Sequence, residues 1–159
     1  MKKAVKIILI GLFLIILIYD TYQIHFKEKD TPSEHLNIEY ENGGNILLQD
    51  IKENDGISMK IKVKNKTDHN VNFTISFLDV VNDLVDPSKV TYSITKEENR
   101  IEIHSDTFPQ ENTMLQEGDL IEQNAECDYI LTIRIEDINE LDQGKDIQAR
   151  IQFLETDAS

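Results

Sequence analysis

Histidine and cysteine are the residue types most able to do chemistry in this 159-residue chain, and their spacing predicts no reactive site. The four histidines form neither His-Glu-x-x-His nor another zinc-ligand spacing, so we expect solvated surface imidazoles. The one cysteine, Cys127, has no histidine near it in sequence and shares the phase of Tyr129 and Leu131, which predicts a small apolar side chain facing the core. A reactive or intermolecularly paired thiol is the alternative. The histidines are His25, His35, His69 and His104.

Acidic side chains form two groups that could offer hard oxygen ligands to Ca²⁺. Neither group has the spacing of an EF-hand loop, because a leucine and a lysine stand where ligands are needed, so we expect solvated loops and keep calcium as an alternative. The six glycines are scattered among turns, and no nucleophile elbow or phosphate-binding glycine loop is present. The sequence therefore predicts no catalytic, cofactor-binding or metal-binding residues. The two acidic groups are Glu136, Asp137, Glu140, Asp142 and Asp146, and Asp79, Asp83 and Asp86.

Two tripeptides match the acceptor pattern for N-linked glycans, Asn65–Thr67 and Asn72–Thr74. They would matter only in a eukaryotic host.

The charge of the chain is strongly lopsided. Three of its 16 basic residues lie before the apolar N-terminal run, whereas all 30 acidic residues lie at or after Asp20. The part after the run therefore carries 13 basic and 30 acidic residues, a net charge of −17. Such a field repels phosphate backbones, whose binding depends on lysine and arginine, so we expect no nucleic-acid partner.

The first residues have the pattern of an N-terminal transmembrane helix. A basic start ending at Lys6 precedes an unbroken apolar run from Ile7 to Tyr19, and Asp20 follows it. This order predicts a cytoplasmic N-terminus and an exported remainder. The run is short for a bilayer of about 30 Å, but it lacks the small residues that a signal peptidase needs. A cleaved signal peptide is the alternative to an anchor. We expect a signal-anchor over residues 1–22, a juxtamembrane stalk over 23–35 and an extracytoplasmic domain over 36–159.

From Leu36 onward, apolar residues recur with a period of two, as in half-buried strands. The runs 57–63 and 71–77 flank a polar turn and are expected to pair as a hairpin. A short helical turn is expected over 79–86, before Pro87. About seven or eight strands in all predict an all-β chain, an antiparallel Ig-like β-sandwich with Greek-key connections. The other runs are 36–40, 46–48, 90–95, 101–103, 127–135 and 147–153.

The order of these features resembles the camelysin and TasA-type surface proteins of Gram-positive bacteria. The resemblance implies a secreted or surface β-sandwich, and some members of that family form biofilm-matrix fibres by passing a terminal strand to the next subunit. This chain lacks the cleavage site that would free such a strand, and it lacks the zinc motif of a metalloprotease. The segments that carry the resemblance are Gly56–Asn65, Glu117–Asp119, Tyr129–Ile133, Asn139–Gly144 and Ile147–Phe153.

These patterns together predict a non-enzymatic, membrane-anchored module that binds a surface or wall protein, or serves as an accessory part of a cell-surface assembly. Unpaired strand edges could accept a partner strand. A secreted matrix or fibre subunit is the alternative from the same location. A metal-dependent hydrolase built on the sandwich is a third hypothesis, from a different class.

Overall fold

The computed structural model of this protein describes residues 35–115 and 118–156. The chain divides into two compact units, residues 1–32 and 33–159, and every described residue belongs to the second unit. The anchor predicted over 1–22, and the predicted stalk except for His35, lie outside the described residues. Within the described ranges, no helix has the length and apolar character that a membrane span requires.

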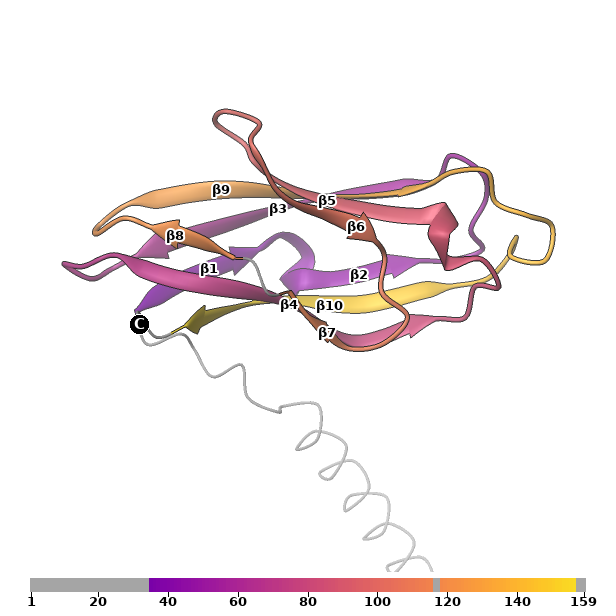
Figure 1. Cartoon of the computed structure of the whole chain (residues 1–159), viewed down its shortest axis with the longest axis horizontal. Coiled ribbons are helices and arrows are strands. Elements are labelled where there is room, and N and C mark those ends of the chain that lie inside the picture. Colours follow the sequence, from indigo (N-terminus) through magenta and orange to yellow (C-terminus); the bar gives the residue numbers. More distant parts are fainter. Residues whose placement is uncertain (1–34, 116–117, 157–159) are drawn as a thin grey trace, which may run out of the picture. The chain divides into compact units, whose positions relative to one another are not determined.

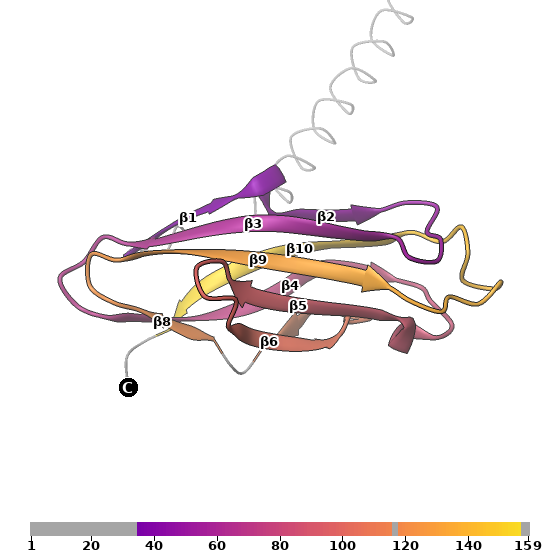
Figure 2. The same cartoon turned by 90° about the horizontal axis from the view of Figure 1, so that it is seen from above.

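The period-two runs form two antiparallel sheets that face each other across one core (Figures 1 and 2). One sheet has the strand order β1-β3-β9-β5-β6, and the other has the order β2-β10-β4-β7, with β8 also paired to β4. The all-β prediction is therefore confirmed for the described residues. The strands are β1 (Leu36–Tyr40), β2 (Asn45–Leu48), β3 (Gly56–Asn65), β4 (Val71–Asn82), β5 (Val90–Lys96), β6 (Glu102–Thr107), β7 (Thr113–Met114), β8 (Asp119–Ile121), β9 (Glu126–Ile135) and β10 (Ile147–Thr156), with short 3-10 helices η1 (Glu41–Gly44) and η2 (Pro87–Lys89).

The core forms because alternate side chains of each strand turn inward. In β9, for example, Tyr129, Leu131 and Ile133 are fully buried, whereas Arg134 is exposed. Burying each such side chain stabilises the fold by about 1.5–3 kcal/mol. Aromatic rings from both sheets meet at the centre of this aliphatic core, where the rings of Phe73 and Tyr129 lie edge to face at 5.6 Å.

The expected hairpin between the runs 57–63 and 71–77 is wrong, because β3 and β4 belong to different sheets. The turn between them carries the chain from one sheet to the other, so the two strands face each other across the core and share no ladder. Alternation shows which face of a strand is buried but does not show which strand is its neighbour. Among the described strands, β5 and β6 are the one consecutive pair that bonds directly.

Asn65 holds this sheet-to-sheet turn together. Its side chain is completely buried, and its amide nitrogen donates hydrogen bonds to the carbonyl oxygens of His69, Ile121 and Glu122 at 2.7, 3.2 and 3.1 Å. Its amide oxygen accepts hydrogen bonds from the backbone and hydroxyl groups of Thr67 at 2.9 and 2.7 Å. The glycan acceptor pattern at Asn65–Thr67 is therefore inaccessible in the folded chain, since this amide is already bonded on both sides.

The helical turn expected over 79–86 is also wrong. Strand β4 continues through Asn82, because β10 pairs with it as far as the partners Ile147 and Asn82. Helix η2 begins only at Pro87. Two short strands, β7 and β8, go beyond the expected count. Between them the chain passes so close to β4 that a Cβ atom on Gly118 would lie 1.5 Å from the carbonyl oxygen of Phe73.

The chain changes sheets between β1 and β2 at a sharp bend. Gly44 has a φ of +77°, and a Cβ atom there would lie 2.9 Å from the carbonyl oxygen of Ile151, so only glycine fits. Strand β1 therefore covers the edge of β3 from Ile61 onward, and β2 covers the edge of β10 up to Arg150. Beyond that point the backbone N–H of Phe153 donates to the Tyr40 hydroxyl at 2.9 Å.

We expect an Asn65→Ala substitution to lower the free energy of unfolding by roughly 2–4 kcal/mol, because it leaves buried carbonyl groups without donors. Asn37→Ala is the matched control, since that amide donates to the exposed Glu39 carboxylate on the outside of β1. The control should change stability by less than about 0.5 kcal/mol. Urea unfolding of the two full-length variants measures the difference, and equal stabilities would contradict the role given to Asn65.

Candidate binding surface

Three loops meet at the end of the two sheets opposite the start of the described chain. They are residues 49–55, 83–89 and 136–146, and Figure 1 shows them at the right-hand end of the molecule. Leu36 and Thr156, which begin the first strand and end the last, lie at the other end, where they pair with Asn65 and Asn72. We name the surface formed by the three loops the loop end.

A buried carboxylate joins two of these loops. Asp142 has no exposed surface, and its oxygens accept hydrogen bonds from the backbone N–H groups of Val85 and Asp86 at 2.7 and 3.1 Å. The Asn139 amide and the Lys145 ammonium donate to the same carboxylate at 2.8 and 2.9 Å. Burial of a charge is tolerated when it is paired and fully hydrogen-bonded, and Asp142 meets both conditions.

The third loop is attached through the backbone. Ile51 donates its N–H to the carbonyl oxygen of Lys145 at 3.0 Å, and Gly144 donates to the carbonyl oxygen of Ile51 at 3.0 Å. The N–H of Asp50 donates to the Asp146 carboxylate, also at 3.0 Å. The Lys145 ammonium further bonds the carbonyl oxygen of Asp83 at 2.6 Å. The loop end is therefore one hydrogen-bonded unit and not three independent loops.

The protonation of Asp142 reflects this environment. Burial by itself raises the pKa of the carboxyl group, but the hydrogen bonds from Val85, Lys145, Asp86 and Asn139 favour the ionised form. They prevail, and the pKa of Asp142 falls to about 2. The carboxylate is therefore charged throughout the physiological range.

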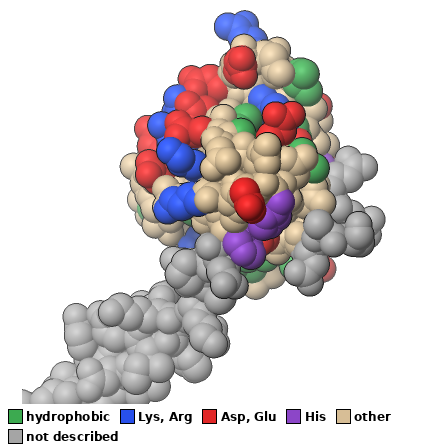
Figure 3. Space-filling view, turned by 90° about the vertical axis from the view of Figure 1, so that its left-hand side faces the viewer, with side chains coloured by type: hydrophobic (Ala, Val, Ile, Leu, Met, Phe, Trp, Pro, Cys, Tyr) green, Lys and Arg blue, Asp and Glu red, His purple; other side chains and the backbone are tan. Residues whose placement is uncertain are grey.

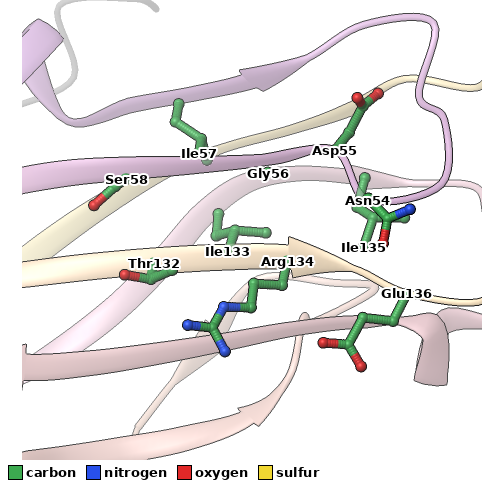
Figure 4. Close-up of a pocket in the computed structure, with 10 residues that line it drawn as sticks. All are labelled: Asn54, Asp55, Gly56, Ile57, Ser58, Thr132, Ile133, Arg134, Ile135 and Glu136. Atoms are coloured by element: carbon green, nitrogen blue, oxygen red, sulfur yellow. The ribbon is translucent and has the colours of Figure 1, made fainter.

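Two shallow hollows adjoin the loop end on the outer face of the first sheet. One, of about 400 Å³, is lined by residues 54–58 and 132–136 (Figure 4). The other, of about 300 Å³, shares Thr132 and Arg134 with it and extends over β5 and β6. The Arg134 side chain lies along the sheet between them. Both hollows are open and present polar groups beside apolar surface, so they could hold a ligand by hydrogen bonds but do not enclose it.

A row of hydroxyl side chains crosses these hollows. Ser58, Thr132, Ser93 and Ser105 are partners in register across β3, β9, β5 and β6. Ser105 donates its hydroxyl hydrogen to the Glu102 carboxylate at 2.6 Å. Hydroxyl groups and a guanidinium can orient a polar ligand by hydrogen bonds.

Ion pairs cover the outer face of the same sheet nearer the start of the chain. The Lys60 ammonium lies 2.5 Å from Glu97 and 2.8 Å from Asp128, and Lys62 lies 3.1 Å from Glu126. The hydrogen bonds that Lys60 donates to the Asp128 and Glu97 carboxylates raise its pKa well above the usual value. The outward-facing Lys60 and Lys62 of β3 are therefore paired with acidic side chains of β9 and of the turn after β5.

Cys127 packs against the edge of the core and is half-buried, which partly agrees with the expectation of an inward-facing side chain. Burial raises the pKa of its thiol, so the neutral form prevails at neutral pH. Next to it, the buried Tyr129 hydroxyl donates to the Asp119 carboxylate at 2.7 Å, and the Lys96 ammonium binds the same oxygen at 2.6 Å. Burial and the bond to Asp119 raise the pKa of Tyr129 far above its usual value.

All three described histidines have side-chain contacts. The His35 ring is paired with the Glu155 carboxylate and meets the His69 ring edge to face at 5.5 Å. His104 stacks on the buried Tyr92 at 5.6 Å, inside β6 and not at a strand end. His69 is exposed as expected. Figure 3 looks onto the end with His35 and His69, where histidine and acidic side chains lie together. His25 lies outside the described residues.

The two acidic groups proposed as calcium ligands do not converge. The oxygens of Asp142 bind N–H donors, and Asp79 lies 3.3 Å from Arg150. In residues 35–115 and 118–156, no three His, Cys, Asp or Glu side chains are grouped so that they could hold a metal ion. The sequence did not distinguish Asp142 from its neighbours. One feature of the sequence could have indicated its role. Asn139, Asp142 and Lys145 are spaced three residues apart, and in the structure the first and last both donate hydrogen bonds to Asp142.

Comparison with known proteins gives no family. No family model matches the sequence, and no curated protein matches it. Similar solved structures include the VP2 subviral particle of infectious bursal disease virus (TM-score 0.36, 7% identity, 77% of this chain and 32% of that chain). A family 123 glycoside hydrolase from Clostridium perfringens has a TM-score of 0.35 and 14% identity over 78% of this chain and 28% of that chain.

The C-terminal domain of a chitobiase from Bacteroides fragilis is a third similar structure (TM-score 0.32, 19% identity, 66% of this chain and 68% of that domain). The chain spans about a third of the length of the VP2 chain that it matches. Scores this low identify neither a family nor an activity.

An Asp142→Asn substitution should lower the free energy of unfolding by about 3 kcal/mol, because it removes the charge that holds Lys145 and replaces one acceptor oxygen with a donor. Asp137→Asn is the matched control in the same loop, since Asp137 is exposed. It should change stability by less than about 0.5 kcal/mol. Urea unfolding compares the two, and a harmless Asp142→Asn variant would refute the account of the loop end.

The same variant gives a pH test. The pKa of Asp142 is about 2 in the folded chain and about 3.9 in an unfolded one, so the carboxylate stabilises the fold above the unfolded value and loses that effect as the pH falls toward 2. The stability gap between the unmodified chain and Asp142→Asn should be constant from about pH 7 to 5 and shrink below about pH 4. A gap that widens on acidification would contradict the lowered pKa.

Proposed function

We propose that this chain is a non-enzymatic binding or accessory module of a bacterial cell-surface assembly. In this proposal the N-terminal helix anchors an Ig-like β-sandwich outside the cell, and the loop end meets the partner. The order of basic, apolar and acidic residues in the first 22 positions supports the anchor and its orientation. A wall or surface protein is the partner that fits this location.

The observation that carries the proposal is the hydrogen-bonded loop end, on the side away from the start of the described chain. Binding residues commonly lie on loops that a rigid scaffold positions, and here Asp142 and the backbone bonds of Ile51 fix all three loops. A tether at Leu36 would leave this surface free to meet a partner, because the two lie at opposite ends of the sheets.

The reactive side chains support a binding role over a catalytic one. The thiol of Cys127 has a raised pKa, which disfavours the nucleophilic thiolate. The imidazoles of His35 and His104 are held by Glu155 and Tyr92, so each has a structural contact. The hollows beside Arg134 are open, as expected for a contact surface.

Protease added to intact cells that express the full chain should remove the sandwich and leave a membrane-bound fragment that begins at Met1. Mass spectrometry of that fragment reports whether the N-terminus is intact. A mature chain that lacks Met1 and is released to the medium would favour a secreted matrix subunit. Leu14→Arg with Ile15→Arg is the control, since charges at the centre of the run should prevent insertion. A sandwich protected in whole cells but digested after lysis would refute the proposed orientation.

Photo-crosslinking tests binding by itself. A photoreactive residue is placed singly at Asp137 on the loop end, at Thr132 on the outer face of the first sheet and at Gln148 on the outer face of the second. A binding module should form a defined protein adduct in cells, and we expect it from Asp137. Absence of an adduct from all three positions would contradict a binding role.

A further inference from the structure

The two most exposed large apolar side chains of the described residues both lie on the loop end. Leu141 is 73% exposed and Val85 is 65% exposed. Single exposed apolar residues are common on protein surfaces and need no explanation. These two differ, because they lie on the two loops that Asp142 joins. Val85 donates its N–H directly to the Asp142 carboxylate, and Leu141 precedes Asp142 in sequence.

The loop end fixes the backbone at both residues. The N–H of Leu141 donates to the Asn139 side chain at 2.8 Å, and the N–H of Val85 donates to Asp142 at 2.7 Å. Within the same loops, Leu84 and Ile138 are buried in the core, with exposed fractions of 4% and 7%. The inward positions are therefore filled, and Leu141 and Val85 are held outward. A backbone fixed before binding loses less entropy when a partner covers the side chains that it presents.

The acidic residues around Leu141 and Val85 indicate the charge of the partner surface. The three loops contain ten acidic and three basic residues. Two of the basic residues, Lys52 and Lys145, already form ion pairs within the loops, with Asp50 and Asp142. The surface around Leu141 and Val85 therefore has a negative field. Such a field repels phosphate-rich polymers and attracts a cationic surface, and it speeds the encounter with the latter.

We propose that the loop end binds a protein surface in which an apolar socket is surrounded by lysine and arginine side chains. Leu141 and Val85 enter the socket and supply most of the affinity, since buried central side chains dominate protein interfaces. The acidic side chains around them pair with the basic rim and set orientation and specificity. This inference rests on the proposed function as a binding module, and it specifies the working surface and the chemistry of the partner.

Cyclodextrins provide a probe of matching chemistry, because they present an apolar cavity whose rim can carry either charge. The full chain, methyl-labelled and inserted in neutral phosphatidylcholine nanodiscs, is titrated with amino-β-cyclodextrin, the neutral form and the carboxymethyl form. We expect the amino form to bind most tightly, with shifts confined to the methyl signals of Leu141 and Val85, and salt should weaken it. Equal binding of the anionic form would overturn the proposal.

Variants separate the socket contact from general charge attraction. Leu141→Ser with Val85→Ser should weaken binding of amino-β-cyclodextrin by roughly tenfold or more, because the apolar groups that enter the cavity are gone. Met114→Ser is the control, since that side chain is 62% exposed on β7, away from the loop end. It should leave binding unchanged. Equal affinity of the two variants would show attraction by charge alone and refute the socket.

Crosslinking in cells from position 141 distinguishes failure of this inference from failure of the proposed function. An adduct on a lysine- and arginine-rich protein surface, lost in the Val85→Ser variant, supports the inference. An adduct from Thr132 or Gln148 but none from position 141 would overturn the inference and leave the binding role intact. An adduct with a phosphate-containing polymer would also overturn it.

Discussion

The buried charge of Asp142 is the constraint on which the far end of the molecule depends. A carboxylate with no exposed surface is stable only while its donors stay in place, so the backbone of residues 85 and 86 and the side chains of Asn139 and Lys145 are fixed together. Through Ile51 the same constraint reaches the third loop. The backbone positions of Val85 and Leu141, which carry the exposed apolar side chains, therefore depend on one ionised group.

Asn65 fixes the backbone at the opposite end of the sheets. From inside the turn, its side chain donates hydrogen bonds to the backbone of three residues. A chain with a single cysteine has no disulfide to hold its sheet-to-sheet connections. Nearly all connections here cross between sheets, so each needs another means of fixing its geometry. Two buried polar side chains, one per end, fulfil that need with hydrogen bonds. Because the polar groups of Asn65 and Asp142 are fully hydrogen-bonded in this arrangement, they also favour it over other packings of the two sheets.

The strands were predictable because burial of one face leaves alternation in the sequence, as in the runs 57–63 and 129–135. Their pairing was not, since the same alternation suits a hairpin and a turn between sheets. The residue that decides between them, Asn65, bonds Ile121 and Glu122, which lie more than fifty positions away. Strand β4 similarly extends to Asn82 through its register with β10, which no local pattern records. In the sequence, nothing separates Asp142 from the other acidic residues, because its burial depends on contacts between distant loops.

The antiparallel pairing of β1 with β3 has a mechanical consequence for a tethered molecule. Leu36 lies at one end of the sheets and the loops at the other, so tension between a membrane attachment and a bound partner would run parallel to the strands. The ladder bonds lie across that direction and would all resist sliding at once, whereas peeling would break them one by one. A sandwich pulled in this way would resist the force best along its strands.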